Sequence, residues 1–425
     1  MLGGPGLILT LWRADLLAQM SIFGKMKGAG VAQELKRRIG LGLLTAYGVG
    51  VMVGAGIYVL VGAVAAEAGV WAPVSFLIAG LVAAPTALSY AEFSARIPEA
   101  AGEAAYVAQG LKLPFIAVLV GLAIVAAGTI SAAAVLRGGM GYLTAAVDVP
   151  LEWAVVAGGV LLTLVAVLGV LESMALAALF TVAELAGLGL VVFAGSVAPV
   201  SPDFTMPDVP LWSGIGAGAV LAFFAFIGFE DIVNMAEEVE RPERVVPRAI
   251  LLSLILTSLI YGAVAVAAVR AVPLEELAAS EQPLVLVWDA GIGGNSSFFV
   301  LIAAVAALNG VLAQIVMASR VLFGLGKRSI LLRVFHHAHP RFGTPVLATL
   351  LLGVAVIYGA LALPVATLAG ATSALLLGVF VLVNAALIMV KRDQPKAAFT
   401  VPMAVPVVGL VLALGALLMT TGMLG

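Results

Sequence analysis

The chain has 425 residues, of which 63% are hydrophobic and 10% charged, with a net charge of −2. Its mean hydropathy is +1.19. A soluble domain carries roughly 25% charged and 45–50% apolar residues, so this composition excludes a water-soluble protein. The near-zero net charge gives no sign of nucleic-acid binding. The absence of Cys excludes disulfides, thiol catalysis and Cys-ligated metals, and we expect no cofactor.

Eleven apolar stretches approach the ~20 residues that a helix needs to span a bilayer. They lie at about 42–66, 73–95, 114–137, 153–171, 174–198, 213–236, 247–270, 297–325, 344–363, 365–390 and 401–423. We therefore predict an all-α polytopic membrane protein with about 11 transmembrane helices.

Lys and Arg residues in the connections predict the orientation of these helices. If the N-terminus is cytoplasmic, 18 of the 21 Lys and Arg residues fall on the cytoplasmic side. The outer side keeps Arg137 and Arg270, and Arg320 lies within the eighth span. We predict a multi-pass plasma-membrane protein whose residues 1–40 form a cytoplasmic segment. Because Met26 begins a more natural cytoplasmic start, we expect residues 1–25 to be dispensable.

Two apolar segments about half a chain apart are interrupted by glycines. The first is Gly48–Tyr58 and the second is Phe223–Asp231. Lipid offers no partners for unpaired backbone groups, so a broken span is tolerated only where those groups line a cavity or hold a ligand. Paired interruptions in two halves are typical of a secondary transporter with its site at the membrane midplane. Alternatively, Gly48, Gly50 and Gly54 only permit close helix packing.

The two breaks would present complementary backbone groups. A half-helix that begins near Ile57 would point unpaired N–H groups and its positive dipole end at a carboxylate. Half-helices that end near Met52 and near Phe224–Ile227 would offer unpaired carbonyls to an ammonium group. A ligand that carries both groups is an α-amino acid, which is the substrate we predict.

Several motifs carry a resemblance to a known family. They are Gly54–Gly62, Ser89–Glu92, Pro98–Glu103, Phe223–Asp231, Ala236–Arg244, Pro247–Ile250, Ala318–Arg320 and His339–Pro345. With these motifs in this order, the chain resembles the amino acid–polyamine–organocation (APC) superfamily of amino acid permeases. The resemblance implies two inverted five-helix repeats, 41–200 and 211–392, with discontinuous helices 1 and 6. Residues 400–425 would form an additional C-terminal transmembrane helix.

The resemblance also implies substrate-binding residues. Backbone groups of Gly54, Ala55 and Gly56 would hold the substrate carboxylate, and the carbonyls of Met52 and Ile227 would take the ammonium. Phe224 would close over the substrate, and Ala225 and Gly228 would line the same wall. To these the residues themselves add Ile57, at the start of the half-helix, and Glu230, after the second break.

Ionisable residues within spans are expensive and commonly functional. Glu230 would either fix the unwound turn or contact substrate, and we expect Asp231 to face water. Glu184 lies in the fifth span, where proton-coupled relatives that this chain resembles often carry Lys. It could carry a proton, bind a cation beside Ser319, or be a neutral structural acid. Glu184 and Ser319 are therefore the predicted ion-coupling residues.

The predicted function is secondary active transport of amino acids by alternating access, with symport of an ion that we expect to be a proton. Span 3 has no acid to receive a cationic side chain, so we expect neutral amino acids. Sodium coupling, an exchanger and a transporter-derived sensor stay open. No nucleotide-binding or catalytic motif indicates an enzyme. His336, His337 and His339 lie in a loop and do not indicate a metal site.

Overall fold

The computed structural model describes residues 39–98, 102–146, 148–168, 174–205, 210–280, 282–294, 297–337, 339 and 344–420. The predictions for residues 1–25 and for most of the N-terminal segment fall outside this part of the chain. Within it, no strand is present, and the only bridge is an isolated parallel one between Ile39 and Val239. The all-α prediction is confirmed.

A helix coincides with each predicted span. Most ends agree to within a few residues, but the helix that begins at Pro114 continues to Ala146 instead of ending at 137, and the helix that begins at Trp212 ends at Phe223 instead of 236. These helices are α2 (Leu41–Ala68), α3 (Ala72–Arg96), α5 (Pro114–Ala146), α6 (Leu151–Leu168), α7 (Met174–Val197), α8 (Trp212–Phe223), α9 (Pro242–Ala271), α12 (Ser297–Arg328), α13 (Val346–Ala362), α14 (Val365–Asp393) and α15 (Ala404–Thr420). Shorter elements join them: η2 (Gly69–Trp71), α4 (Gly102–Leu111), η3 (Phe224–Phe226), η4 (Glu230–Glu238), α10 (Leu274–Ala279), α11 (Pro283–Gly291) and η5 (Ile330–Phe335).

Membrane crossing is supported by helix length and composition. In the described part of the chain, 8 helical stretches of at least 18 residues are apolar enough to cross a bilayer. Three further apolar helices are shorter: Leu41–Val53, Val346–Ala362 and Ala404–Thr420. The polytopic character is confirmed, whereas the count of eleven crossings and the repeat symmetry stay predictions.

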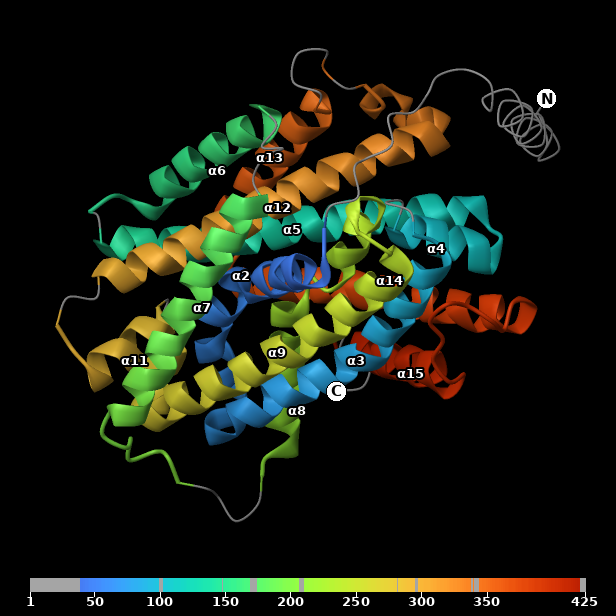
Figure 1. Cartoon of the computed structure of the whole chain (residues 1–425). Coiled ribbons are helices and arrows are strands. Elements are labelled where there is room, and N and C mark those ends of the chain that lie inside the picture. Colours follow the sequence, from blue (N-terminus) through green and yellow to red (C-terminus); the bar gives the residue numbers. More distant parts are fainter. Residues whose placement is uncertain are drawn as a thin grey trace, which may run out of the picture. The chain divides into compact units, whose positions relative to one another are not determined.

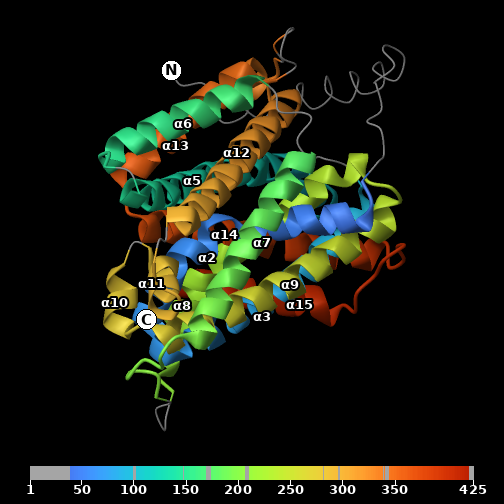
Figure 2. The ribbon, with the colours of Figure 1, turned by 60° about the vertical axis from the view of Figure 1, so that its left-hand side comes forward.

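Glycine and alanine bring the helices into close contact. Figures 1 and 2 show α5 beside α12 and α6 beside α13, pairs that pack along one another. A Cβ on Gly139 of α5 would lie 2.1 Å from the Ala307 Cβ of α12. A Cβ on Gly195 of α7 would lie 2.5 Å from the Ala267 Cβ of α9. Small residues at such contacts let backbones approach where lipid provides no hydrophobic driving force.

A buried ion cluster joins the ends of α3 and α14. Glu92 accepts hydrogen bonds from Lys391 Nζ at 2.7 and 2.9 Å and from Arg96 Nε at 3.0 Å. The Val401 N–H donates to Glu92 Oε2 at 2.9 Å, and Lys391 donates to the Val401 carbonyl. The Glu92 side chain is fully buried. Glu92 therefore pairs with Arg96 of its own helix and with Lys391 of α14.

Glu92→Gln should strongly destabilise the protein, because it leaves Lys391 buried without a counter-charge. Breaking a buried pair by removing one partner costs about 3–5 kcal/mol. We expect a lower melting temperature in detergent, partly recovered in a Glu92→Gln/Lys391→Met double variant. Lys112→Met, which removes an exposed ion pair with Asp393, is the control. A Glu92→Gln melting temperature equal to that of the control would contradict this account.

Candidate functional site

The second predicted break is present and consists of four successive backbone changes. The α-helix α8 ends at Phe223 and continues as the 3-10 turn η3. Ile227 is extended, with φ −61° and ψ 133°. Gly228 has φ 125°, a conformation that favours glycine, and the chain resumes as the 3-10 helix η4. The polypeptide therefore unwinds between Phe223 and Glu230, inside a buried region.

Glu230 holds this break together. Its Oε2 accepts the Gly228 N–H at 2.9 Å, two residues earlier in the chain. The side chain is buried. The expected stabilising role of Glu230 toward the loosened backbone is thus observed, because the bond satisfies a donor that has lost its helical partner.

The first predicted break is absent. The helix α2 runs as one α-helix from Leu41 to Ala68, so the prediction that helix 1 is discontinuous is wrong for this structure. Its glycines are contact points instead: a Cβ on Gly50 would lie 2.0 Å from Thr181 Oγ1, and one on Gly56 would lie 2.9 Å from the Ala225 Cα. The alternative that these glycines permit close packing accounts for the observed geometry.

A tyrosine connects α2 with the break in the second segment. The Tyr261 hydroxyl of α9 lies 2.5 Å from the Met52 carbonyl oxygen and 2.8 Å from that of Ala225. A hydroxyl has one proton, so it donates to one carbonyl at a time. The ring is buried and packs edge-on against Phe76 and Phe226. Tyr261 was missed by the sequence analysis, although a buried Tyr generally needs a hydrogen-bond partner.

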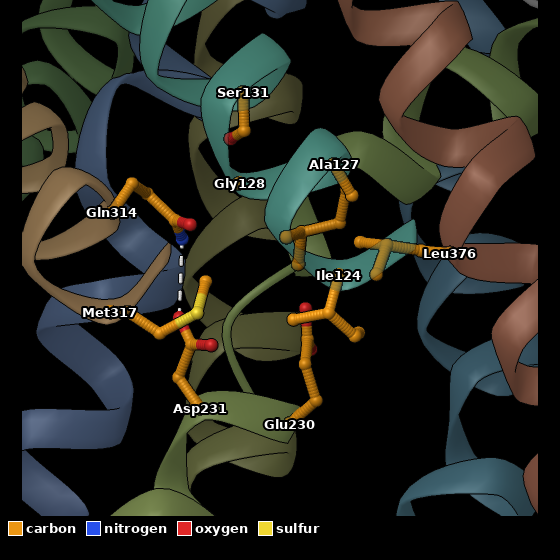
Figure 3. A pocket seen from close by; sticks show the side chains of 10 residues that line it. Ile124, Ala127, Gly128, Ser131, Glu230, Asp231, Gln314, Met317 and Leu376 are labelled. Atoms are coloured by element: carbon orange, nitrogen blue, oxygen red, sulfur yellow. Dashed lines mark hydrogen bonds between the residues drawn. The ribbon is translucent and has the colours of Figure 1, made fainter. Parts of the chain in front are cut away.

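A pocket lies directly beside the break (Figure 3). Its lining residues come from α5, the break and η4, α12 and α14. They are Ile124, Ala127, Gly128, Ser131, Ile227, Glu230, Asp231, Gln314, Met317 and Leu376. In this conformation the pocket has room for about one water molecule. It therefore admits a single small polar group.

Two carboxyl groups dominate the electrostatics of the pocket. Figure 3 shows Glu230 and Asp231 facing the same space, with Gln314 on the opposite wall. The Gln314 Nε2 donates to Asp231 Oδ2 at 3.1 Å. Asp231 is 4% exposed, so the expectation that it faces water is wrong. Among the lining residues that the structure describes, no Lys, Arg or His balances these acids.

A third acid lies on the short helix α4, outside the spanning helices. Glu103 is buried, and burial raises its pKa to about 7, with a further upward contribution from the charge of Asp231. The concentration of acids around the break therefore extends beyond the pocket lining. Burial and a neighbouring negative charge both favour the neutral form of Glu103, whereas a positive charge close by would favour its ionised form.

The predicted substrate residues divide into two sets. Ile227 and Glu230 line the pocket. Six others lie in the break or on α2 and are not among the described lining residues: Met52, Gly56, Ile57, Phe224, Ala225 and Gly228. Gly54 and Ala55 lie on α2, and their surroundings are outside the described part of the structure. Contact between Gly56 and Ala225 nevertheless brings the two predicted breaks together. Gln314 was missed, although a polar residue within a span is itself a signal of function.

The predicted ion-coupling pair is not brought together. Asn309 Nδ2 donates to Glu184 Oε1 at 3.4 Å, and the Tyr58 hydroxyl donates to the Glu184 backbone carbonyl at 3.0 Å. Glu184 Oε2 is buried without a hydrogen-bond partner. The Ser319 hydroxyl bonds within its own helix to the Val316 carbonyl. Ser319 is ten residues beyond Asn309 on α12, about 15 Å along the axis, so a cation shared by Glu184 and Ser319 has no support.

The broken apolar helix beside a buried polar pocket defines a multi-pass membrane protein with an internal site of the transporter type. Residues 39–424 match the family model described as amino acid permease. The chain therefore belongs to the amino acid permease family, within the APC superfamily.

Its relatives carry transporter names. A branched-chain amino acid permease of Bacillus subtilis is 28% identical over 93% of this chain and 90% of its own length. A methylthioribose transporter of the same bacterium is 29% identical over 80% of this chain and 78% of its own. A cationic amino acid transporter of Arabidopsis thaliana is 29% identical over 77% of this chain and 58% of its own. These names differ in substrate, so membership of the family alone leaves the side-chain preference open.

Gly228→Ala should destabilise the break. At φ 125° a side chain is strained, which costs on the order of 1–3 kcal/mol. Its Cβ would also meet Val51 Cγ1 at 2.8 Å. We expect a lower melting temperature and loss of ligand binding, measured by thermal unfolding in detergent. Gly216→Ala is the control, because its Cβ would meet only Met419 at 3.6 Å; equal melting temperatures for the two variants would contradict the role of Gly228.

Proposed function

We propose that this protein is a secondary active transporter of amino acids that works by alternating access. The observation that carries the proposal is the helix break at Ile227–Gly228, which opens beside a buried pocket lined by Glu230 and Asp231. A break of this kind supplies backbone carbonyls to a ligand ammonium. Its location in the plasma membrane with a cytoplasmic N-terminus is part of the same proposal.

The substrate class that we propose is the neutral amino acids. Apolar side chains form much of the pocket wall: Ile124, Ala127, Met317 and Leu376. The name of the branched-chain permease relative supports the same class. In this proposal the ammonium lies at Ile227, and the substrate carboxylate lies toward Gly54, Ala55 and Gly56.

Binding requires a change in α2. Its N–H groups at Gly54–Gly56 lie within a continuous helix, where they bond to carbonyls four residues earlier. Glycine is about 1 kcal/mol less favourable in a helix than Ala, so local unwinding there is comparatively cheap. We propose that the substrate stabilises this unwound form and that separation of Met52 from Ala225, which Tyr261 links, accompanies it.

For ion coupling we propose Glu184 as a proton carrier, acting without Ser319. Its support is the position of a carboxyl in an apolar helix, with one oxygen held weakly by Asn309 and the other unpaired. Such a group is more stable neutral than charged and can be alternately loaded and emptied. Exchange without a gradient and a sensor without flux are the competing functions.

Uptake into proteoliposomes tests the proposed function. We expect saturable accumulation of labelled neutral amino acids that collapses when an inward proton gradient is removed in sodium-free buffer. Liposomes without protein and a panel that includes Lys and Arg serve as controls. Saturable uptake indifferent to the gradient would point to exchange or sodium coupling. Binding without uptake by folded protein would favour the sensor and contradict transport.

Glu184→Gln should separate coupling from transport. The amide cannot carry a proton, so we expect gradient-driven accumulation to be abolished while exchange of internal for external substrate continues. Asp289→Asn, at an exposed acid on α11, is the control and should accumulate substrate as the unmodified protein does. Undiminished accumulation by Glu184→Gln would show that Glu184 is a neutral structural acid.

A further inference from the structure

The pocket beside the break presents hydrogen-bond acceptors from three directions. Glu230 and Asp231 contribute carboxyl groups from η4, and Gln314 contributes its amide from α12. Because Gln314 directs its Nε2 to Asp231, its Oε1 points the other way, toward α5. A Cβ on Gly128 would lie 3.0 Å from that oxygen, so the glycine leaves space in front of it.

Ser131 supplies a second, independent indication of a ligand. It lines the same pocket from α5, and it is 5% exposed. Within the described part of the chain its hydroxyl makes no hydrogen bond to protein, and its oxygen is open to the pocket. A ligand or a water in the pocket can therefore complete its hydrogen bonds. Figure 3 places Ser131 across the pocket from the two carboxyl groups.

The carboxyl groups of the pocket favour a ligand with a positively charged group. Two carboxyl groups face the pocket, and none of its described lining residues is Lys, Arg or His. Arg320 of α12 is not among the lining residues, and its side chain is exposed. Carboxylates in such surroundings are stabilised by an opposite charge at short range.

The size of the pocket limits which positively charged groups can enter it. Space for about one water molecule suits a primary ammonium group, which has a similar size and three N–H donors. A planar guanidinium is too large for it. We propose that Glu230, Asp231 and Ser131 form a side-chain subsite for the α-ammonium group of the substrate, in addition to the carbonyl of Ile227.

This subsite rests on the proposed function and refines it. Binding through backbone carbonyls alone is insensitive to side-chain substitutions in the pocket. Binding through the carboxylates predicts that the protein recognises an ammonium even when the ligand has no carboxylate. Asp231 and Ser131 are the residues that distinguish the two, because Glu230 also holds the Gly228 N–H.

The test is a competition-binding series on the purified full-length protein at pH 7. The probes are L-leucine and L-alanine, their decarboxylated amines isopentylamine and ethylamine, and their deaminated acids 4-methylpentanoate and propanoate. We expect the amines to compete with labelled amino acid and the deaminated acids not to compete. Asp231→Asn should weaken the binding of both the amino acid and the amine by on the order of tenfold, and Ser131→Ala should weaken it less.

The control is Asp289→Asn, which should bind the amino acids and the amines with the same affinity as the unmodified protein. If Asp231→Asn fails to fold, Ser131→Ala decides, since its hydroxyl supports no described contact. Unchanged amine and amino acid affinities in both variants would overturn the subsite while leaving transport intact. The subsite would also be overturned if these variants weakened the binding of the amino acid and of the deaminated acid equally. No binding of either amino acid to the unmodified protein would overturn the proposed function and the subsite together.

Discussion

The structure depends on hydrogen bonds to the backbone N–H and C=O groups that lose their helical partners where an apolar helix breaks. At Gly228 the freed N–H is accepted by Glu230 Oε2, and at Ala225 the freed carbonyl is reached by the Tyr261 hydroxyl. In a bilayer, each group left unsatisfied would cost several kcal/mol. These two side chains therefore make it possible for the chain to unwind inside the protein, and the pocket exists because the chain unwinds there.

The contrast between the two predicted breaks follows from the same constraint. Next to α2, no carboxylate replaces the helical partners of the N–H groups of Gly54–Gly56, and the helix stays intact. Instead its glycines accept close neighbours, such as Thr181 at Gly50 and Ala225 at Gly56. The first segment, Gly48–Tyr58, holds four glycines and stays helical, whereas the second, Phe223–Asp231, holds one and is broken. The hydrogen-bond surroundings, and not the glycine content, therefore distinguish the two segments. A substrate carboxylate would supply to α2 the acceptor that Glu230 supplies to Gly228.

Apart from Glu92, which is paired with Lys391 and Arg96, buried acids lie near the break and at Glu184, with different surroundings. Glu230 and Asp231 face one pocket, and Asp231 is held by Gln314. Glu184 lies between α7 and α12 near Asn309, with one oxygen unpaired. In the proposed mechanism, Glu230 and Asp231 interact with the ligand, and Glu184 changes its charge without touching that ligand. The two proposed roles would then be carried by different groups.

The sequence by itself determined the fold class, the approximate helix ends and the position of the second break. Length and hydropathy determine where a helix can lie in an apolar medium, and Ile227–Gly228 with the following acids interrupts that pattern locally. Motifs such as Phe223–Asp231 also led to the family. The tertiary structure alone decided that α2 stays continuous, that Asp231 is buried against Gln314, and that Glu184 meets Asn309 and not Ser319. These features depend on the rotation and axial offset of one helix against another. These helices carry apolar residues on most of their faces. The sequence therefore gives little information about which face of a helix contacts which neighbouring helix.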